Sequence, residues 1–167
     1  MKTLLDTANA WYLRGVILVL FVLASAKVAS SVQDTPLLAT PDPLFGFLSV
    51  RQLTVIAALT EYGLALVLRR SSSGLIFKNA NIAWLSTAFA AYRAGLHFIG
   101  YRGSCKCLGE IAGWLDLSDQ AASRVTYGLF FLLLVGSYGF LGLQFILSAN
   151  SNFKGDFEHK VRFELGR

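Results

Sequence analysis

The stretch Gly15-Val-Ile-Leu-Val-Leu-Phe-Val-Leu-Ala-Ser-Ala26 contains no charged side chain, and Ser25 is its only polar one. With its flanks it forms an apolar run over residues 11–31, which is long enough for a helix to cross a bilayer core of about 30 Å. The sequence therefore predicts a membrane-spanning helix here. A cleaved secretory signal peptide is the alternative, because Ala24-Ser-Ala26 resembles a cleavage site, but we expect the helix to be retained.

Three further apolar runs follow at residues 52–68, 77–99 and 122–148. Hydrophobic residues make up 54% of the 167-residue chain and charged residues only 15%, which is not the composition of a soluble domain. The sequence thus predicts an all-α integral membrane protein with four transmembrane helices in an up-down bundle over residues 1–149. The polar remainder, 150–167, is expected to be a cytoplasmic tail that either forms a short amphipathic helix or frays.

The connections between the predicted spans differ in character. All three prolines of the chain lie between the first two spans. Pro41-Asp-Pro43 cannot continue a helix, because proline lacks an N–H group and clashes with the preceding turn. After the third span, Ile111, Trp114 and Leu115 recur at helical spacing. We expect a short interfacial helix there, lying along the membrane surface.

The distribution of basic residues predicts how the chain crosses the membrane. If the N-terminus is cytoplasmic, the inside segments hold nine Lys and Arg residues and the outside segments four. By the positive-inside rule, we expect a multi-pass protein of the bacterial inner membrane with both termini in the cytoplasm and the loop after the third span in the periplasm. The net charge of +5 is thereby explained, and without a basic face interleaved with aromatic residues we expect contact with membrane lipid and no nucleic-acid partner.

The loop after the third span holds the only two cysteines, Cys105 and Cys107, separated by Lys106. Outside the cytoplasm a disulfide can form and persist. A Cys-X-Cys disulfide closes a small, strained ring that is easy to reduce, and the positive charge of Lys106 favours the thiolate that attacks in exchange. These features are typical of a redox-active pair. A permanent structural disulfide and two idle thiols are the alternatives, and the spacing alone does not decide between them.

The same cysteines are also candidates for a metal site, with His97 as a third ligand and Glu110 as a fourth. No motif with zinc-type spacing is complete, because His97 lies at a predicted helix end, eight residues before Cys105. We therefore expect no bound metal.

Three ionisable residues are predicted at membrane depth: Glu61 in the second span, and Arg93 and His97 on one face of the third. Charges there are costly and normally pair or face a polar cavity. In antiparallel helices Glu61 and Arg93 lie at neighbouring depths, so we expect an ion pair between them. The alternative is a polar pocket beneath the cysteine loop, for proton transfer or for a quinone headgroup, although no motif supports a cofactor. Lys27 is expected to extend its long side chain to the headgroups.

Several of these elements occur together in one known family. Pro41-Asp-Pro43, Glu61, Tyr92-Arg93 and Cys105-Lys-Cys107-Leu-Gly109 resemble the DoxX/MauE group of small redox-associated membrane proteins, closest to its MauE-like branch. The resemblance covers residues 11–148 and implies a four-helix membrane bundle with a role in extracytoplasmic thiol–disulfide chemistry. It implicates the two cysteines as the redox pair. Unlike four-helix disulfide-forming enzymes with two cysteine pairs and a bound quinone, this chain has no second pair, so a separate partner would supply or accept electrons.

We therefore predict a membrane-embedded thiol–disulfide redox protein, a candidate oxidoreductase, that exchanges electrons through Cys105 and Cys107 with a thioredoxin-like or secreted partner. The residues expected to support this chemistry are Lys106, Arg93, His97 and Glu61. The alternative is a non-enzymatic accessory subunit of a larger membrane protein complex, with the cysteine pair as a static disulfide. The glycine and alanine faces of the predicted helices suit that role, because small residues let membrane helices approach closely.

Overall fold

The computed structural model describes residues 2–33, 36–70, 74–101 and 118–165 of the chain. The predicted redox pair and the predicted interfacial helix fall in the segment 102–117, and so they lie outside the described residues.

The described residues form four long helices and one short helix, and they contain no β-strand. The helices are α1 (Lys2–Ser31), α2 (Pro36–Ala39), α3 (Val50–Arg69), α4 (Leu75–Phe98) and α6 (Asp119–Leu165). The predicted all-α class is therefore confirmed for this part of the chain.

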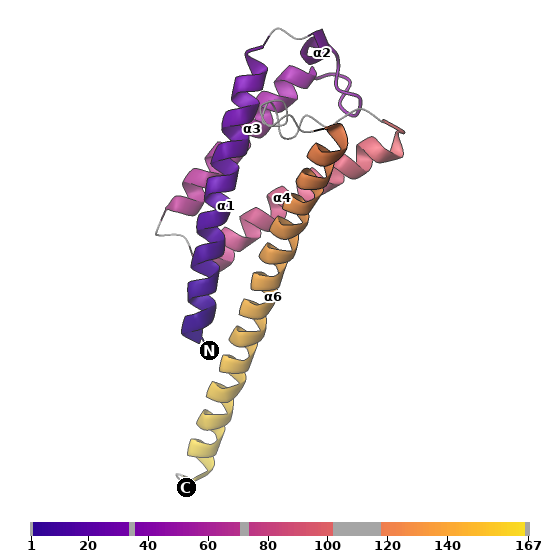
Figure 1. Cartoon of the computed structure of the whole chain (residues 1–167). Coiled ribbons are helices and arrows are strands. Elements are labelled where there is room, and N and C mark those ends of the chain that lie inside the picture. Colours follow the sequence, from indigo (N-terminus) through magenta and orange to yellow (C-terminus); the bar gives the residue numbers. More distant parts are fainter. Residues whose placement is uncertain (1, 34–35, 71–73, 102–117, 166–167) are drawn as a thin grey trace.

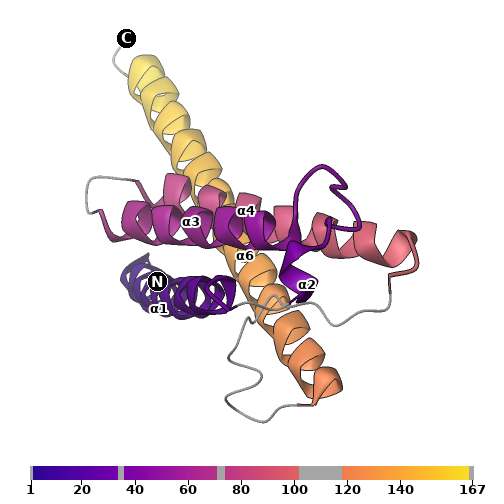
Figure 2. The same ribbon diagram turned by 90° about the horizontal axis from the view of Figure 1, so that it is seen from above.

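The four long helices alternate in direction along the chain. α1 rises from the N-terminus, α3 returns, α4 rises again and α6 descends to the C-terminus (Figure 1). Packing is closest within two helix pairs, α1 with α3 and α4 with α6, whereas α3 and α4 touch much less. Figure 2 shows α6 running obliquely beneath α4 when the bundle is seen from above. The chain thus consists of two tight helix pairs with a looser junction between them.

Apolar side chains from all four long helices meet in one buried cluster. Its buried members are Leu13, Val16 and Leu20 from α1, Ala65 and Leu68 from α3, Ile82 and Leu85 from α4, and Leu133 from α6. The three α1 residues recur at spacings of three and four, so they form a single stripe on that helix. This stripe joins the two helix pairs.

Polar contacts add specific points of attachment between the helices. The hydroxyl oxygens of Ser25 and Tyr62 lie 2.7 Å apart, between α1 and α3. Tyr12 on α1 donates a hydrogen bond of 2.9 Å to the carbonyl oxygen of Leu133 on α6. Gly136 makes this approach feasible, because a Cβ atom there would lie only 2.5 Å from the Tyr12 ring. α1 therefore depends on a glycine of α6 for its position.

The start of α3 is encoded locally. The Ser49 hydroxyl accepts a hydrogen bond from the Gln52 backbone N–H at 3.2 Å, and the Gln52 side-chain oxygen accepts one from the Ser49 N–H at 2.9 Å. This reciprocal capping box satisfies two N–H groups that a helix start would otherwise leave unpaired. The helix consequently begins at Val50.

Within the described part of the chain, three helices are long and apolar enough to cross a membrane: Thr7–Ser31, Val50–Arg69 and Arg124–Leu147. Large apolar side chains such as Leu18 and Phe131 are exposed on their outer faces, as expected for helices that contact lipid. These helices indicate a membrane protein. α4 covers the predicted span 77–99 except its last residue but is not among these three helices, so the four-span bundle stays a prediction.

The last helix is much longer than the predicted span 122–148. α6 has 47 residues, which at a rise of about 1.5 Å per residue corresponds to about 70 Å. Its C-terminal part extends well beyond the other helices (Figure 1). Helical structure thus continues through the tail to Leu165, where either an amphipathic helix or a frayed end was expected.

Candidate functional site

A buried ion pair links α1 to α3. The Lys27 ammonium donates a hydrogen bond to Glu61 Oε1 at 2.6 Å. Lys27 is 5% exposed and Glu61 1% exposed, so both charges are removed from the surroundings. The other carboxylate oxygen of Glu61, Oε2, has no hydrogen-bond partner among the described residues. Because a buried charge without its partner is costly, neither residue can lose its charge alone without destabilising the fold.

This pair corrects two sequence-based expectations. Lys27 does not extend to the headgroups but turns inward to Glu61. Glu61 therefore pairs with Lys27 and not with Arg93. The physical reason is the helix pairing: α3 packs along α1, which places the α1 lysine beside the carboxylate, whereas α4 packs along α6.

Arg93 instead contacts α6. Its guanidinium donates a hydrogen bond of 3.0 Å to the Tyr127 hydroxyl and lies 5.0 Å from the centroid of the Tyr127 ring. His97, one turn further along α4, is exposed. The structure therefore does not bring Glu61, Arg93 and His97 together in one polar pocket.

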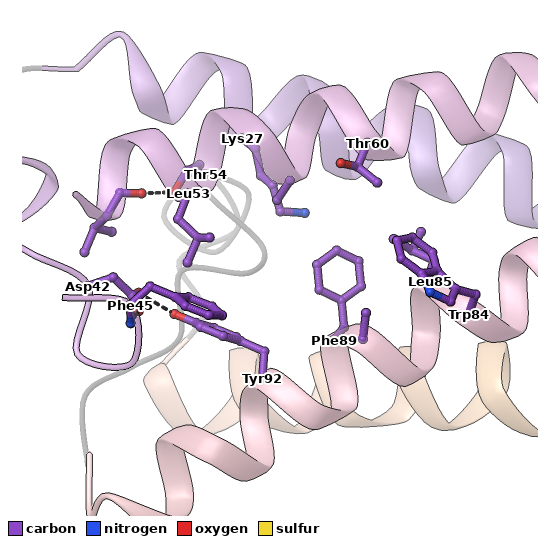
Figure 3. Close-up of a pocket in the computed structure, with 13 residues that line it drawn as sticks. Lys27, Asp42, Phe45, Leu53, Thr54, Thr60, Trp84, Leu85, Phe89 and Tyr92 are labelled. Atoms are coloured by element: carbon purple, nitrogen blue, oxygen red, sulfur yellow. Dashed lines mark hydrogen bonds between the residues drawn. The ribbon is translucent and has the colours of Figure 1, made fainter. Parts of the chain in front are cut away.

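A cavity of about 310 Å³ lies between α3 and α4. Its residues are Val50, Leu53, Thr54, Ala57 and Thr60 from α3, Trp84, Leu85, Ala88, Phe89 and Tyr92 from α4, Asp42 and Phe45 from the loop before α3, and Lys27 from α1. Figure 3 shows the Lys27 side chain extending from behind α3 into the space in front of Phe89. The cavity is thus an apolar chamber with one buried ammonium in its wall.

The Lys27 ammonium is the charged hydrogen-bond donor in this wall. The two threonine hydroxyls, of Thr54 and Thr60, each bond at 2.8 Å to a backbone carbonyl one turn earlier in α3. The Lys27 nitrogen lies 5.7 Å from the centroid of the Phe89 ring, in a cation–π contact. An ammonium carries three N–H donors, and the carboxylate of Glu61 takes one of them.

The loop before α3 closes one end of the cavity. Asp42 is 2% exposed, and its Oδ1 accepts hydrogen bonds of 2.9 Å from the backbone N–H groups of Leu44 and Phe45. Its Oδ2 accepts a hydrogen bond of 2.6 Å from the Tyr92 hydroxyl on α4. The Phe45 ring stacks on Tyr92 with centroids 6.1 Å apart and an interplanar angle of 7° (Figure 3). One carboxylate therefore organises the loop and attaches it to α4.

The same loop also packs against a glycine of α4. A Cβ atom on Gly95 would lie only 3.0 Å from the Leu44 side chain, so a glycine at this position lets the loop approach α4 closely. The loop crosses back on itself, with an isolated bridge between Pro41 and Ser49. This compact shape explains why the proline-rich connection forms a fixed cover and not a free linker.

Sequence reasoning missed three of the residues that make this site: Lys27 as a cavity residue, and Asp42 with Tyr92 as the cover. The sequence signal for Lys27 was a positive charge within one apolar run, because the next apolar run carries the negative charge of Glu61. Charges within membrane spans normally pair, so the two residues were candidate partners. No comparable local signal marks Asp42, whose partner lies 50 residues away.

Among the described residues, no group of three His, Cys, Asp or Glu side chains is placed to hold a metal ion. The cysteines and Glu110, which were the candidate ligands with His97, lie outside the described residues.

Comparisons of the chain with protein-family models, with curated proteins and with solved structures find no match. The likeness to the DoxX/MauE group therefore rests on the sequence motifs alone.

Proposed function

We propose that this chain is a membrane-embedded thiol–disulfide redox protein that acts through Cys105 and Cys107. What supports it is where α4 ends and α6 begins, the two helices that residues 102–117 connect. The C-terminal end of α4 and the N-terminal end of α6 lie at the end of the bundle opposite both termini (Figure 1). The chain therefore leaves α4 and enters α6 at the same end of the bundle, which suits an exchange reaction with a partner on one side of the membrane.

Two arginines at the end of α3 support this orientation. α3 ends at Arg69, which Arg70 follows, on the side of the N-terminus. By the positive-inside rule this side is cytoplasmic, and the cysteine segment then faces the oxidising side of a bacterial inner membrane.

The proposed reaction is a dithiol–disulfide exchange. One cysteine thiolate attacks the disulfide of a thioredoxin-like partner and forms a mixed disulfide, and the second cysteine resolves it. The partner disulfide becomes a dithiol by gaining two electrons and two protons, and the pair in this chain becomes a disulfide by losing them. Lys106 favours the attacking thiolate through its positive charge.

Alkylation of isolated membranes tests this proposal. A membrane-impermeant maleimide should label the pair only after mild reduction, and the labelled fraction should titrate with a redox buffer near the potential of the compartment. After this reduction, Cys105→Ser and Cys107→Ser should each abolish the reduction of added oxidised thioredoxin to its dithiol, whereas the neighbouring Ser104→Ala should not. Unchanged thioredoxin reduction in either cysteine variant would show that the proposal is wrong.

A second candidate function is that of an accessory subunit in a larger membrane protein complex. The observation that favours it is the length of α6, whose C-terminal part projects past the rest of the bundle. In that case a stable complex should co-purify with the double Cys105→Ser/Cys107→Ser variant and be lost when the chain is cut after residue 149. Loss of the complex in the cysteine variant, or its survival after the cut, would exclude this role.

A further inference from the structure

From the cavity between α3 and α4, we infer a binding site for a neutral, planar, lipid-soluble molecule whose carbonyl oxygen accepts a hydrogen bond from Lys27. The inference does not depend on the proposed redox function.

The size and walls of the cavity define the apolar part of the ligand. At about 310 Å³ it is at the small end of the range for ligand pockets, so it suits one ring system better than a lipid with two acyl chains. Phe45 and Tyr92 stack at one end, Phe89 lies in the middle, and Trp84 lies toward the opposite end (Figure 3). Aromatic walls of this kind favour a planar ring, because rings pack in offset-stacked or edge-to-face contact.

The Lys27 ammonium defines the polar part of the ligand. Its nitrogen is buried, faces the cavity and uses one donor for Glu61. A ligand oxygen that accepts a hydrogen bond would satisfy a second donor. Burying this donor without a partner is costly, whereas a hydrogen bond from a charged group is stronger than one between neutral groups.

The charge balance of the site favours a neutral acceptor over an anion. The 2.6 Å pair of Lys27 and Glu61 has no net charge, so an anion placed against the ammonium would also face the carboxylate nearby. The carboxylate of Asp42 adds a further negative charge at the covered end. A carbonyl group brings an acceptor without adding a third negative charge.

The route into the site favours a ligand that dissolves in the membrane. Trp84 is 66% exposed, and Thr60 and Ala88 are also exposed, so the cavity opens sideways between α3 and α4. The loop held by Asp42 and Tyr92 covers the end nearer the membrane surface. A molecule would therefore reach Lys27 from the side of the bundle, where α3 meets lipid.

Energy transfer from Trp84 to the neutral naphthyl ketone Prodan tests the site. The experiment uses the full chain in detergent, with Trp11→Phe and Trp114→Phe so that Trp84 is the only tryptophan. Binding in the cavity should give saturable quenching of Trp84 emission together with Prodan emission. Transfer that rises linearly with Prodan, without saturation, would mean partition into detergent and would overturn the proposal.

Two variants and one control locate the bound probe. Ala88→Leu should weaken binding at least tenfold, because the added side chain fills the cavity, whereas Ala94→Leu on an exposed part of α4 outside the cavity should not change it. Lys27→Met combined with Glu61→Leu should weaken binding about tenfold by removing the charged donor, and it should shift Prodan emission to shorter wavelength. Unchanged affinity in the Ala88 variant would refute the site, and unchanged affinity and emission in the double variant would refute the role of Lys27.

Discussion

Removal of the Lys27 charge should destabilise the protein severely, and the structure allows the size of the effect to be worked out. Lys27→Met keeps an unbranched side chain of similar length, so the packing of the stem against its surroundings is largely preserved. What is lost is the 2.6 Å charged hydrogen bond between Lys27 and Glu61 Oε1. Glu61 is 1% exposed, and its second oxygen, Oε2, has no hydrogen-bond partner among the described residues. Stranding one member of such a pair costs about 3–5 kcal/mol.

The companion variants separate the charge from the packing. Glu61→Gln keeps an acceptor oxygen for Lys27 and should cost less than Lys27→Met. Combining Lys27→Met with Glu61→Leu removes both charges and should recover most of the loss, because a buried ion pair replaced by apolar residues is often close to neutral in stability. Arg14→Met, at an exposed position on the same helix, serves as the control and should change stability by less than about 0.5 kcal/mol.

Equilibrium unfolding in mixed micelles, followed by tryptophan fluorescence, measures these differences. From most to least stable, the expected order is wild type, the double variant, Glu61→Gln and Lys27→Met. A Lys27→Met variant within about 1 kcal/mol of wild type would refute the reasoning, since that is the range of exposed ion pairs. A double variant less stable than Lys27→Met would refute it as well, because it would show that packing and not charge dominates.

Two further contacts lead to measurable predictions. Tyr92→Phe should cost about 1.5–3 kcal/mol by removing a hydrogen bond to the buried carboxylate of Asp42, and faster hydrogen exchange in the loop that Asp42 organises would confirm the contact. Equal exchange in wild type and variant would contradict it. Gly136→Val should destabilise by about 1–3 kcal/mol because the new side chain collides with Tyr12, whereas Gly139→Val, which meets open space, should have a smaller effect in the same unfolding assay. Equal effects at the two glycines would argue against the close approach of α1 and α6.

The helices were predictable to the extent that their signals are local. The apolar run at 11–31 lies within α1, and the run at 52–68 lies within α3, because length and composition determine where a helix can cross lipid. The start of α3 is equally local, since the capping residues Ser49 and Gln52 are neighbours in sequence. The end of the last helix was not predictable in this way, because the polar tail carries no apolar run to mark it.

The candidate site was predictable only as a set of residue types. Glu61 lies in the middle of α3, as expected, but its partner was assigned to the wrong helix. Depth depends on position along one helix and can be counted from sequence. The choice between Lys27 and Arg93 depends on which helices pack together and on how each is rotated, and neither is encoded in a local pattern.

By itself the sequence determined that this chain is helical and suited to a membrane, because those properties follow from the order of apolar and polar residues within single segments. Only the tertiary structure decided that Lys27 faces Glu61, that Arg93 faces Tyr127, and that a cavity separates α3 from α4. These pairings join residues 34 positions apart, and they result from the summed packing of whole helices. Each long helix has several faces on which it could pack, and the free energy that selects one of them belongs to the bundle and not to any segment of it.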